Sequence, residues 1–366
     1  MNQLEVAFSG ITDYRDIRRI THLLTDIIGL AVIGTIAGCL CYEDIEDFGN
    51  THYEWLKKYL KLFNGIPSHD TIERLFENIH PKEFSTCFVA WVSATFPLLD
   101  EEFLHIDGKS NKGSRDKSND KKMLHSVSVF AGNNHLSLAQ LKVADKSNEM
   151  VAIPLLIDTL DVKDKTITID AMGCQKTIAR VIADKKAHYI LAVKANQLAL
   201  LEEIETAFTL SPISSKSTTK EKGHGREEER TCDVISDLHF IDQQQHWSGL
   251  SRVIRLSSKR TIKGETSKET RYFISNKAQE SDFFKRAIRS HWGIENSLHW
   301  VLDVLFEEDG CRKNKENAAE NFNLIRKMGL NILRHYKEDK ISLRRRVLKA
   351  AWSTDYLDKL LQNLVR

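Results

Sequence analysis

The sequence has no paired cysteines, no long hydrophobic run and little net charge. Its six cysteines are scattered, and none shows the C-x-x-C spacing of a zinc site, so we expect a reduced protein without structural zinc. The most apolar run, residues 27–41, is too short to span a bilayer and contains three glycines, which predicts a buried helix. The start lacks the basic region of a signal peptide, which favours a cytoplasmic location.

The charges almost cancel, because 53 basic and 51 acidic side chains leave a formal net charge of +2. Any binding to a polyanion must therefore come from local basic patches rather than from an overall field. With 366 residues, 41% of them hydrophobic, the chain is long enough for two or three domains with ordinary cores.

Two short apolar stretches each run into an aspartate. Residues 103–107 end on Asp107, and residues 165–170 end on Asp170, with a glycine one and three positions later. This pattern predicts two buried strands that each deliver a carboxylate to a sheet edge. Carboxylates held rigidly in this way suit a shared divalent cation, which a lone aspartate would bind weakly.

The order of predicted elements indicates an α/β fold. A three-strand meander (103–107, 124–131 and 136–143) precedes alternating strands and helices between 148 and 208, which predicts parallel strands with right-handed crossovers. This is the element order of a ribonuclease H-like catalytic core with a mixed sheet. In that fold the first and fourth strands are neighbours, so Asp107 and Asp170 are expected to lie close together.

Five segments follow from these patterns. They are an N-terminal all-helical, DNA-binding candidate domain (1–98), the first part of the catalytic domain (99–209), a β-rich insertion (210–279), a catalytic helix that closes the core (280–335) and a basic helical C-terminal segment (336–366). Within the first, the break at 65–70 is compatible with a DNA-binding helix-turn-helix and equally with an ordinary helical hairpin. Within the insertion, residues 214–219 are predicted to be loop.

A third carboxylate, Glu295, falls on a predicted helix over residues 281–299. His291, Glu295, His299 and Asp303 recur every four residues and share one helix face. From this helix alone, pairing of Glu295 with Arg289 or with the histidines is as good an interpretation as a metal site. A zinc site built from Glu295 and the two histidines is disfavoured, since no cysteine or third histidine joins them at a recognisable spacing.

Several strings, in this order, resemble those of the H-repeat-associated transposases, a DDE family linked to Rhs elements. The strings lie at 105–109, 145–149, 168–175, 193–197, 224–228 and 291–296, with two more at 44–49 and 65–71 in the helical domain. The resemblance covers nearly the whole chain. The wider DDE signature around the glutamate would place arginine at 291 and lysine at 302, but this chain has His291 and Leu302.

The resemblance implies a bacterial insertion-sequence transposase that cleaves DNA strands and transfers 3′ ends. It implies that Asp107, Asp170 and Glu295 hold two Mg²⁺ ions, with Mn²⁺ able to substitute, and that they act as ligands rather than as general acids. The expected partners are double-stranded DNA, both element ends and target, and a second copy of the chain on DNA. The expected location is the cytoplasm, at the nucleoid.

Basic residues around this site are candidates for DNA contact, although solvated loops would look much the same. The candidates are Lys109, Lys112, Lys194, His224, Arg226, Arg230 and Arg289. Trp292 and Trp300 are predicted to pack in the core, and Trp247 is expected there in preference to stacking on an unpaired base. Two other functions remain open: a structure-specific metal-dependent nuclease, and a domesticated DNA-binding protein without catalysis.

Overall fold

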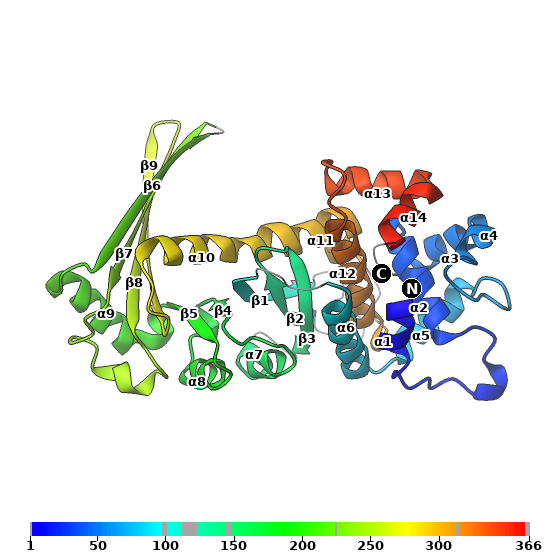
Figure 1. Ribbon diagram of the computed structural model, residues 1–366, viewed down its shortest axis with the longest axis horizontal. Helices are drawn as coiled ribbons and strands as arrows, with labels where there is room; N and C mark the ends of the chain where they lie inside the picture. Colours follow the sequence, from blue (N-terminus) through cyan, green and yellow to red (C-terminus); the bar gives the residue numbers. More distant parts are fainter. Residues whose placement is uncertain are drawn as a thin grey trace.

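A nine-stranded mixed sheet is the central element of the fold. The computed structural model describes residues 2–96, 101–111, 123–143, 148–223, 225–311 and 315–362. Within them the strand order is β3-β2-β1-β4-β5-β9-β8-β7-β6. Figure 1 shows the sheet running from a group of helices at one end to a long arm of strands at the other. The architecture is therefore mixed α/β with a large mixed sheet and many helices.

Five strands make the half of the sheet that carries the aspartates. They are β1 (Phe103–Asn111), β2 (Leu124–Ala131), β3 (Leu136–Val143), β4 (Thr166–Ile169) and β5 (His188–Val193). The first three form an antiparallel meander, while β4 is parallel to both β1 and β5. The predicted adjacency of the first and fourth strands is thus confirmed. Their side chains are mostly buried apolar residues, as expected for strands covered on both faces.

The insertion adds four antiparallel strands that we call the arm. They are β6 (Ser215–Gly223), β7 (Arg226–Ile235), β8 (Arg252–Ile262) and β9 (Glu265–Ser275), and β9 pairs with β5 so that the sheet is continuous. The prediction of a loop at 214–219 is wrong for residues 215–219, because these residues lie in β6. Strand β6 is an edge strand with polar side chains on both faces, so it has no apolar alternation for a sequence pattern to detect.

Helices cover the two faces of the sheet. In Figure 1, α7 (Glu149–Asp158) and α8 (Lys176–Asp184) lie on one face and α10 (Ser281–Gly293) crosses the other, while α9 (Leu198–Leu210) lies beside the arm. Helix α10 continues through a π-helical turn, η7 (Ile294–His299), into α11 (Trp300–Phe306). This long helical run therefore passes from the arm, over β4 and β1, to the helical end of the molecule.

The helical end combines the N-terminal helices with the last part of the chain. It contains α1 (Asn2–Phe8), α2 (Leu24–Ile36), α3 (Tyr42–Thr51), α4 (Tyr53–Leu56), α5 (His69–Asn78), α6 (Pro81–Thr95), α12 (Ala318–His335), α13 (Leu343–Trp352) and α14 (Thr354–Gln362). Helix α2 is apolar all round because it is buried, and α12 packs against it and against α5, α6 and β3. None of the helices in the described ranges has the length and apolar character that a bilayer crossing needs.

Candidate active site

The register between β1 and β4 brings the two aspartates together. The parallel pairing ends with Ile106 beside Ile169, so Asp107 and Asp170 occupy the next positions on the two strands. The prediction that the strand ends at Asp107 is wrong, since β1 continues to Asn111 and Asp107 pairs with Ser128 of β2. Only β4 ends there. The sheet therefore opens beside Asp107 on the β4 side, and both carboxylates line the resulting pocket.

Asp170 is fixed by the turn that follows it. Its Oδ1 accepts hydrogen bonds from the backbone N–H groups of Met172 (3.0 Å) and Gly173 (3.4 Å), which caps a short 3₁₀ turn over Ala171–Gly173. A Cβ on Gly173 would lie 2.2 Å from Cγ2 of Ile169, so this close approach requires glycine. The glycine that follows the second aspartate by three positions thus serves to seat the aspartate.

Glu295 enters from the opposite side, on the π-helical turn η7. Its Oε2 lies 3.1 Å from Nδ1 of His299, and the same Nδ1 lies 3.7 Å from Oδ2 of Asp107. The metal-binding atoms of Asp107, Glu295 and His299 all lie within 4.8 Å of one another. π-turns occur often at functional sites, and this one carries both Glu295 and His299.

The three carboxylates face one pocket of about 350 Å³. Asp170 lines it together with Asp107 and Glu295 but is not part of the tighter group around His299. The apolar side chains of Ile169, Ile190, Phe273, Ile288 and Ile294 complete much of its wall. A largely apolar wall with a few convergent charges is typical of a site that strengthens electrostatic interactions.

Burial and the proximity of like charges make it unfavourable for all three carboxylates of the pocket to be ionised together. Burial raises the pKa of Asp107 to about 6; His299 opposes this rise, whereas Asp170 and Glu295 add to it. The hydrogen bond from His299 lowers the pKa of Glu295. A cation between these groups would remove the repulsion, so the donor set and its charge fit a divalent metal ion.

A hydrogen-bonded chain that the sequence patterns missed joins the site to its supports. Nδ1 of His105 lies 2.6 Å from the Thr168 hydroxyl, which lies 2.7 Å from Nδ1 of His291, and Nε2 of His105 lies 2.8 Å from the Ser290 hydroxyl. Burial lowers the pKa of His105, and it lowers that of His291 to about 4, so both imidazoles are neutral. The chain ties α10 to β1 and β4. The sequence feature that could have revealed this chain is the alternation in the two strands, because His105 and Thr168 each lie two residues before an aspartate and so on the same strand face as that aspartate.

The position where the wider DDE signature has arginine is therefore filled here by a neutral histidine. His291 is hydrogen-bonded to Thr168 rather than to a carboxylate. Among the described residues, it is not part of the group formed by Asp107, Glu295 and His299. The set of two histidines and Glu295 that was considered for zinc is not assembled. His299 alone joins the carboxylates.

Lys109 lies two residues after Asp107 and on the same face of β1. Its ammonium lies 2.5 Å from Oδ1 of Asp303, 2.6 Å from Oε2 of Glu308 and 3.3 Å from the carbonyl oxygen of His299. The side chain is mostly buried. Contact of Lys109 with DNA phosphate stays a prediction, and in this arrangement the ammonium is already held by two carboxylates.

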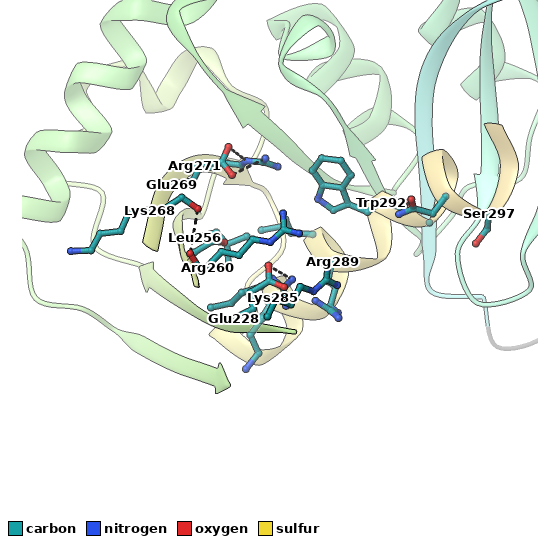
Figure 2. A pocket seen from close by; sticks show the side chains of 17 residues that line it. Glu228, Leu256, Arg260, Lys268, Glu269, Arg271, Lys285, Arg289, Trp292 and Ser297 are labelled. Carbon is teal, nitrogen blue, oxygen red and sulfur yellow. Dashed lines mark hydrogen bonds and ion pairs between the residues drawn. The ribbon is translucent and has the colours of Figure 1, made fainter. Parts of the chain in front are cut away.

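A basic groove of about 760 Å³ lies beside the carboxylate pocket, between the arm and α10. Arg271, Ile288 and Trp292 line both cavities, so the two are neighbours. Figure 2 shows Lys285 and Arg289 of α10 facing Glu228, Arg260 and Arg271 of the arm. The cationic side chains that line the groove are Arg226, Arg230, Arg260, Lys268, Arg271, Lys285 and Arg289, against the two carboxylates Glu228 and Glu269.

The remaining candidates for DNA contact have different surroundings. Lys194 is exposed at the rim of the carboxylate pocket. Arg226, Arg230 and Arg289 line the basic groove. Lys112 and His224 lie outside the described residues.

The prediction that Trp292 and Trp300 pack in the core is wrong, because they are 49% and 60% exposed. Trp292 lines both cavities, and the Arg271 guanidinium lies over its ring, 5.1 Å from the ring centroid. Trp247 is only 1% exposed, which confirms its predicted place in the core.

Comparison with known proteins gives consistent relationships. The family described as "Transposase DDE domain" matches residues 95–332, and the family described as "DDE_Tnp_1-associated" matches residues 6–92. "Putative transposase YncI" of Escherichia coli O157:H7 is 43% identical over 96% of this chain and 93% of its own length. "H repeat-associated putative transposase YhhI" of Escherichia coli K12 is 41% identical over 99% of this chain and 98% of its own length.

Among solved structures, a piggyBac transposase synaptic complex with hairpin DNA matches with a TM-score of 0.48 and 11% identity. The match covers 100% of this chain and 77% of that chain.

Proposed function

The chain belongs to the DDE transposase family, and on that premise we propose that Asp107, Asp170 and Glu295 are the ligands of its catalytic metal ions. The resemblance seen in the sequence is thereby confirmed, and the function is that of an insertion-sequence transposase. DDE enzymes depend on divalent metal; for this chain we propose two Mg²⁺ ions, replaceable by Mn²⁺. The ribonuclease H-like assignment of β1 to β5 belongs to the same proposal.

One observation carries the assignment of the site. Two neighbouring parallel strands and the π-helical turn each contribute a carboxylate to one pocket, although the three residues lie far apart in the sequence. When bound, the cations activate the attacking oxygen and stabilise the leaving oxygen of the phosphodiester. Asp170 is oriented by backbone N–H groups and Glu295 by His299, so little reorganisation is needed to receive a cation.

The DNA path follows from the positions of the cationic side chains. Lys194 at the rim of the pocket is placed to contact a phosphate next to the reacting one. Arg226, Arg230 and Arg289 then extend the contact along the basic groove toward the arm. We propose double-stranded DNA, element ends and target, as the substrate, and the nucleoid of the bacterial cytoplasm as the location.

Two further parts of the proposal concern assembly. Joining two element ends requires two active sites, so we propose a homodimer on DNA. We propose that the N-terminal segment, 1–98, makes DNA contacts of its own. We also propose that the five segments defined from the sequence are the domains of the protein. Light scattering on a complex with an element end tests the dimer, and a monomeric complex at all concentrations would contradict it.

The activity is tested by incubating the protein with a supercoiled plasmid that carries the terminal DNA flanking its gene. We expect nicked and linear products with Mg²⁺ or Mn²⁺ and none with EDTA. Sequencing of the products then separates the two enzymatic functions, since a transposase joins a freed 3′ end to target DNA whereas a nuclease stops after cutting. Tight, specific binding without any cutting would support the noncatalytic alternative.

We expect Glu221→Gln to tighten DNA binding several-fold. Oε2 of Glu221 lies 3.0 Å from Nη2 of Arg289 and 3.3 Å from Nη1 of Arg230, where a phosphate oxygen would bind. Removing this charge frees the Arg289 guanidinium, whereas Arg230 keeps its ion pair with Glu228, and the slope of log affinity against log salt should become steeper by about one unit. Fluorescence anisotropy of labelled DNA in EDTA, over a salt series, measures both quantities.

Glu227→Gln is the matched control for this prediction. Glu227 lies on the same hairpin, but its carboxylate pairs with Lys222 rather than with the groove arginines. An equal gain in affinity for Glu227→Gln would show a general charge effect, and an unchanged affinity for Glu221→Gln would remove Arg289 from the DNA path.

A further inference from the structure

His299 is buried beside the carboxylates and is not one of the three side chains proposed above as metal ligands. It is 3% exposed and enters the site from the last residue of the π-helical turn. Nδ1 faces Glu295 and Asp107, whereas Nε2 is buried and has no hydrogen-bond partner among the described residues. In the metal-free protein Nδ1 carries the hydrogen bond to Glu295, and a cation bound at Nδ1 would take the place of that hydrogen and leave the ring proton on Nε2.

The spacing of the three groups matches that of ligands around one cation. Adjacent ligands of an octahedral cation with bonds of about 2.1 Å lie about 3 Å apart. The distances from Nδ1 of His299 are 3.1 Å to Oε2 of Glu295 and 3.7 Å to Oδ2 of Asp107. A small movement of Asp107 toward the ring is all that such a ligand set needs.

We propose that His299 is itself a ligand of one catalytic metal ion, through Nδ1, together with Asp107 and Glu295. The inference rests on the proposed function, because it concerns the metal ions of that site. A nitrogen ligand binds Mn²⁺ and Co²⁺ better than Mg²⁺, which prefers oxygen. His299 therefore shifts the metal preference of this chain from Mg²⁺ toward Mn²⁺ and Co²⁺, relative to a site built only from carboxylates.

The direct test is the electron spin-echo envelope modulation of Mn²⁺ bound to the full-length protein without DNA. We expect the modulation of a directly bound nitrogen in the wild type, altered by heavy-isotope labelling of histidine and absent in His299→Gln. Glutamine keeps a side chain that can still donate a hydrogen bond to Glu295, so a loss of the nitrogen signal reports ligation rather than positioning. Titration calorimetry should show a Co²⁺ affinity reduced at least about tenfold in this variant, with a smaller loss for Mg²⁺.

His291→Gln is the matched control, because His291 lies on the same helical run and lines the same pocket, but its Nδ1 is bonded to Thr168. It should keep the nitrogen modulation and the ratio of Co²⁺ to Mg²⁺ affinity. Bound Mn²⁺ without nitrogen modulation in the wild type, modulation that persists in His299→Gln, or no Mn²⁺ binding at all would overturn the proposal. These readouts need no DNA cleavage, so an inactive protein that shows the modulation would contradict the proposed function and leave the ligand assignment standing.

Discussion

Asp107→Asn is expected to lower strand cleavage by roughly a thousandfold or more while leaving DNA affinity within a few-fold of the wild type. The asparagine keeps the size of the side chain and removes the charge that the metal ions need. Asp107 is not among the residues that line the basic groove, so the DNA path along the groove is unchanged. Plasmid nicking in Mg²⁺ and anisotropy in EDTA measure the two effects separately.

The same substitution should stabilise the protein when no metal is present. Burial raises the pKa of Asp107 to about 6 in the fold, against an ordinary value of 3.8. Asp107 therefore favours folding while protonated, and that contribution is lost as the pH rises from about 4 through 6. A shift of about two units corresponds to roughly 3 kcal/mol at pH 7, as an upper limit. Urea unfolding in EDTA should show Asp107→Asn to be more stable at pH 7 and equal to the wild type near pH 4.

Asp158→Asn is the control, since Asp158 is exposed and pairs with Lys185. It should change neither cleavage nor metal-free stability appreciably. Normal cleavage by Asp107→Asn would remove Asp107 from the site, and a loss of DNA binding in step with cleavage would point to a folding defect instead.

The elements that the sequence predicts well are those with an apolar pattern. Strands β1 to β5 are mostly buried, and the apolar runs of β1 and β4 ahead of an aspartate and a glycine singled out the two carboxylates. Adjacency of the first and fourth strands then followed from the order of the elements. Glu295 was found because its helical spacing to the histidines is regular.

The parts that escaped prediction lack such a pattern or depend on distant partners. The arm is polar, so the residues of β6 up to 219 were predicted to be loop. Trp292 has the apolar character of a core residue and yet is exposed, beside an arginine of the arm that lies close only in three dimensions.

Lys109→Met is expected to lower the free energy of unfolding by about 3–5 kcal/mol, the usual cost of leaving one member of a buried ion pair alone. The lysine connects β1 to Asp303 on α11 and to Glu308 just beyond it. Glu308 is only 3% exposed, and although burial alone raises its pKa, the Lys109 ammonium holds that pKa below its ordinary value. Without the ammonium, this carboxylate is buried with Lys327 and Arg326 as its remaining cationic neighbours. Urea unfolding at neutral pH measures the loss.

A second substitution separates this structural role from contact with DNA. If the cost arises from an uncompensated charge at Glu308, then Lys109→Met combined with Glu308→Gln should recover part of the stability, and the double-mutant cycle gives the coupling energy. Lys142→Met is the control, because Lys142 is more exposed and lies 3.7 Å from its partner Glu320, so its loss should matter little. Wild-type stability of Lys109→Met together with weaker, less salt-dependent DNA binding would instead show that the ammonium leaves its carboxylates for a phosphate. The ion pairs of Lys109 join the strand of Asp107 to the helical run that carries Glu295. The predicted loss of stability should therefore also reduce the fraction of protein in which the carboxylates are assembled.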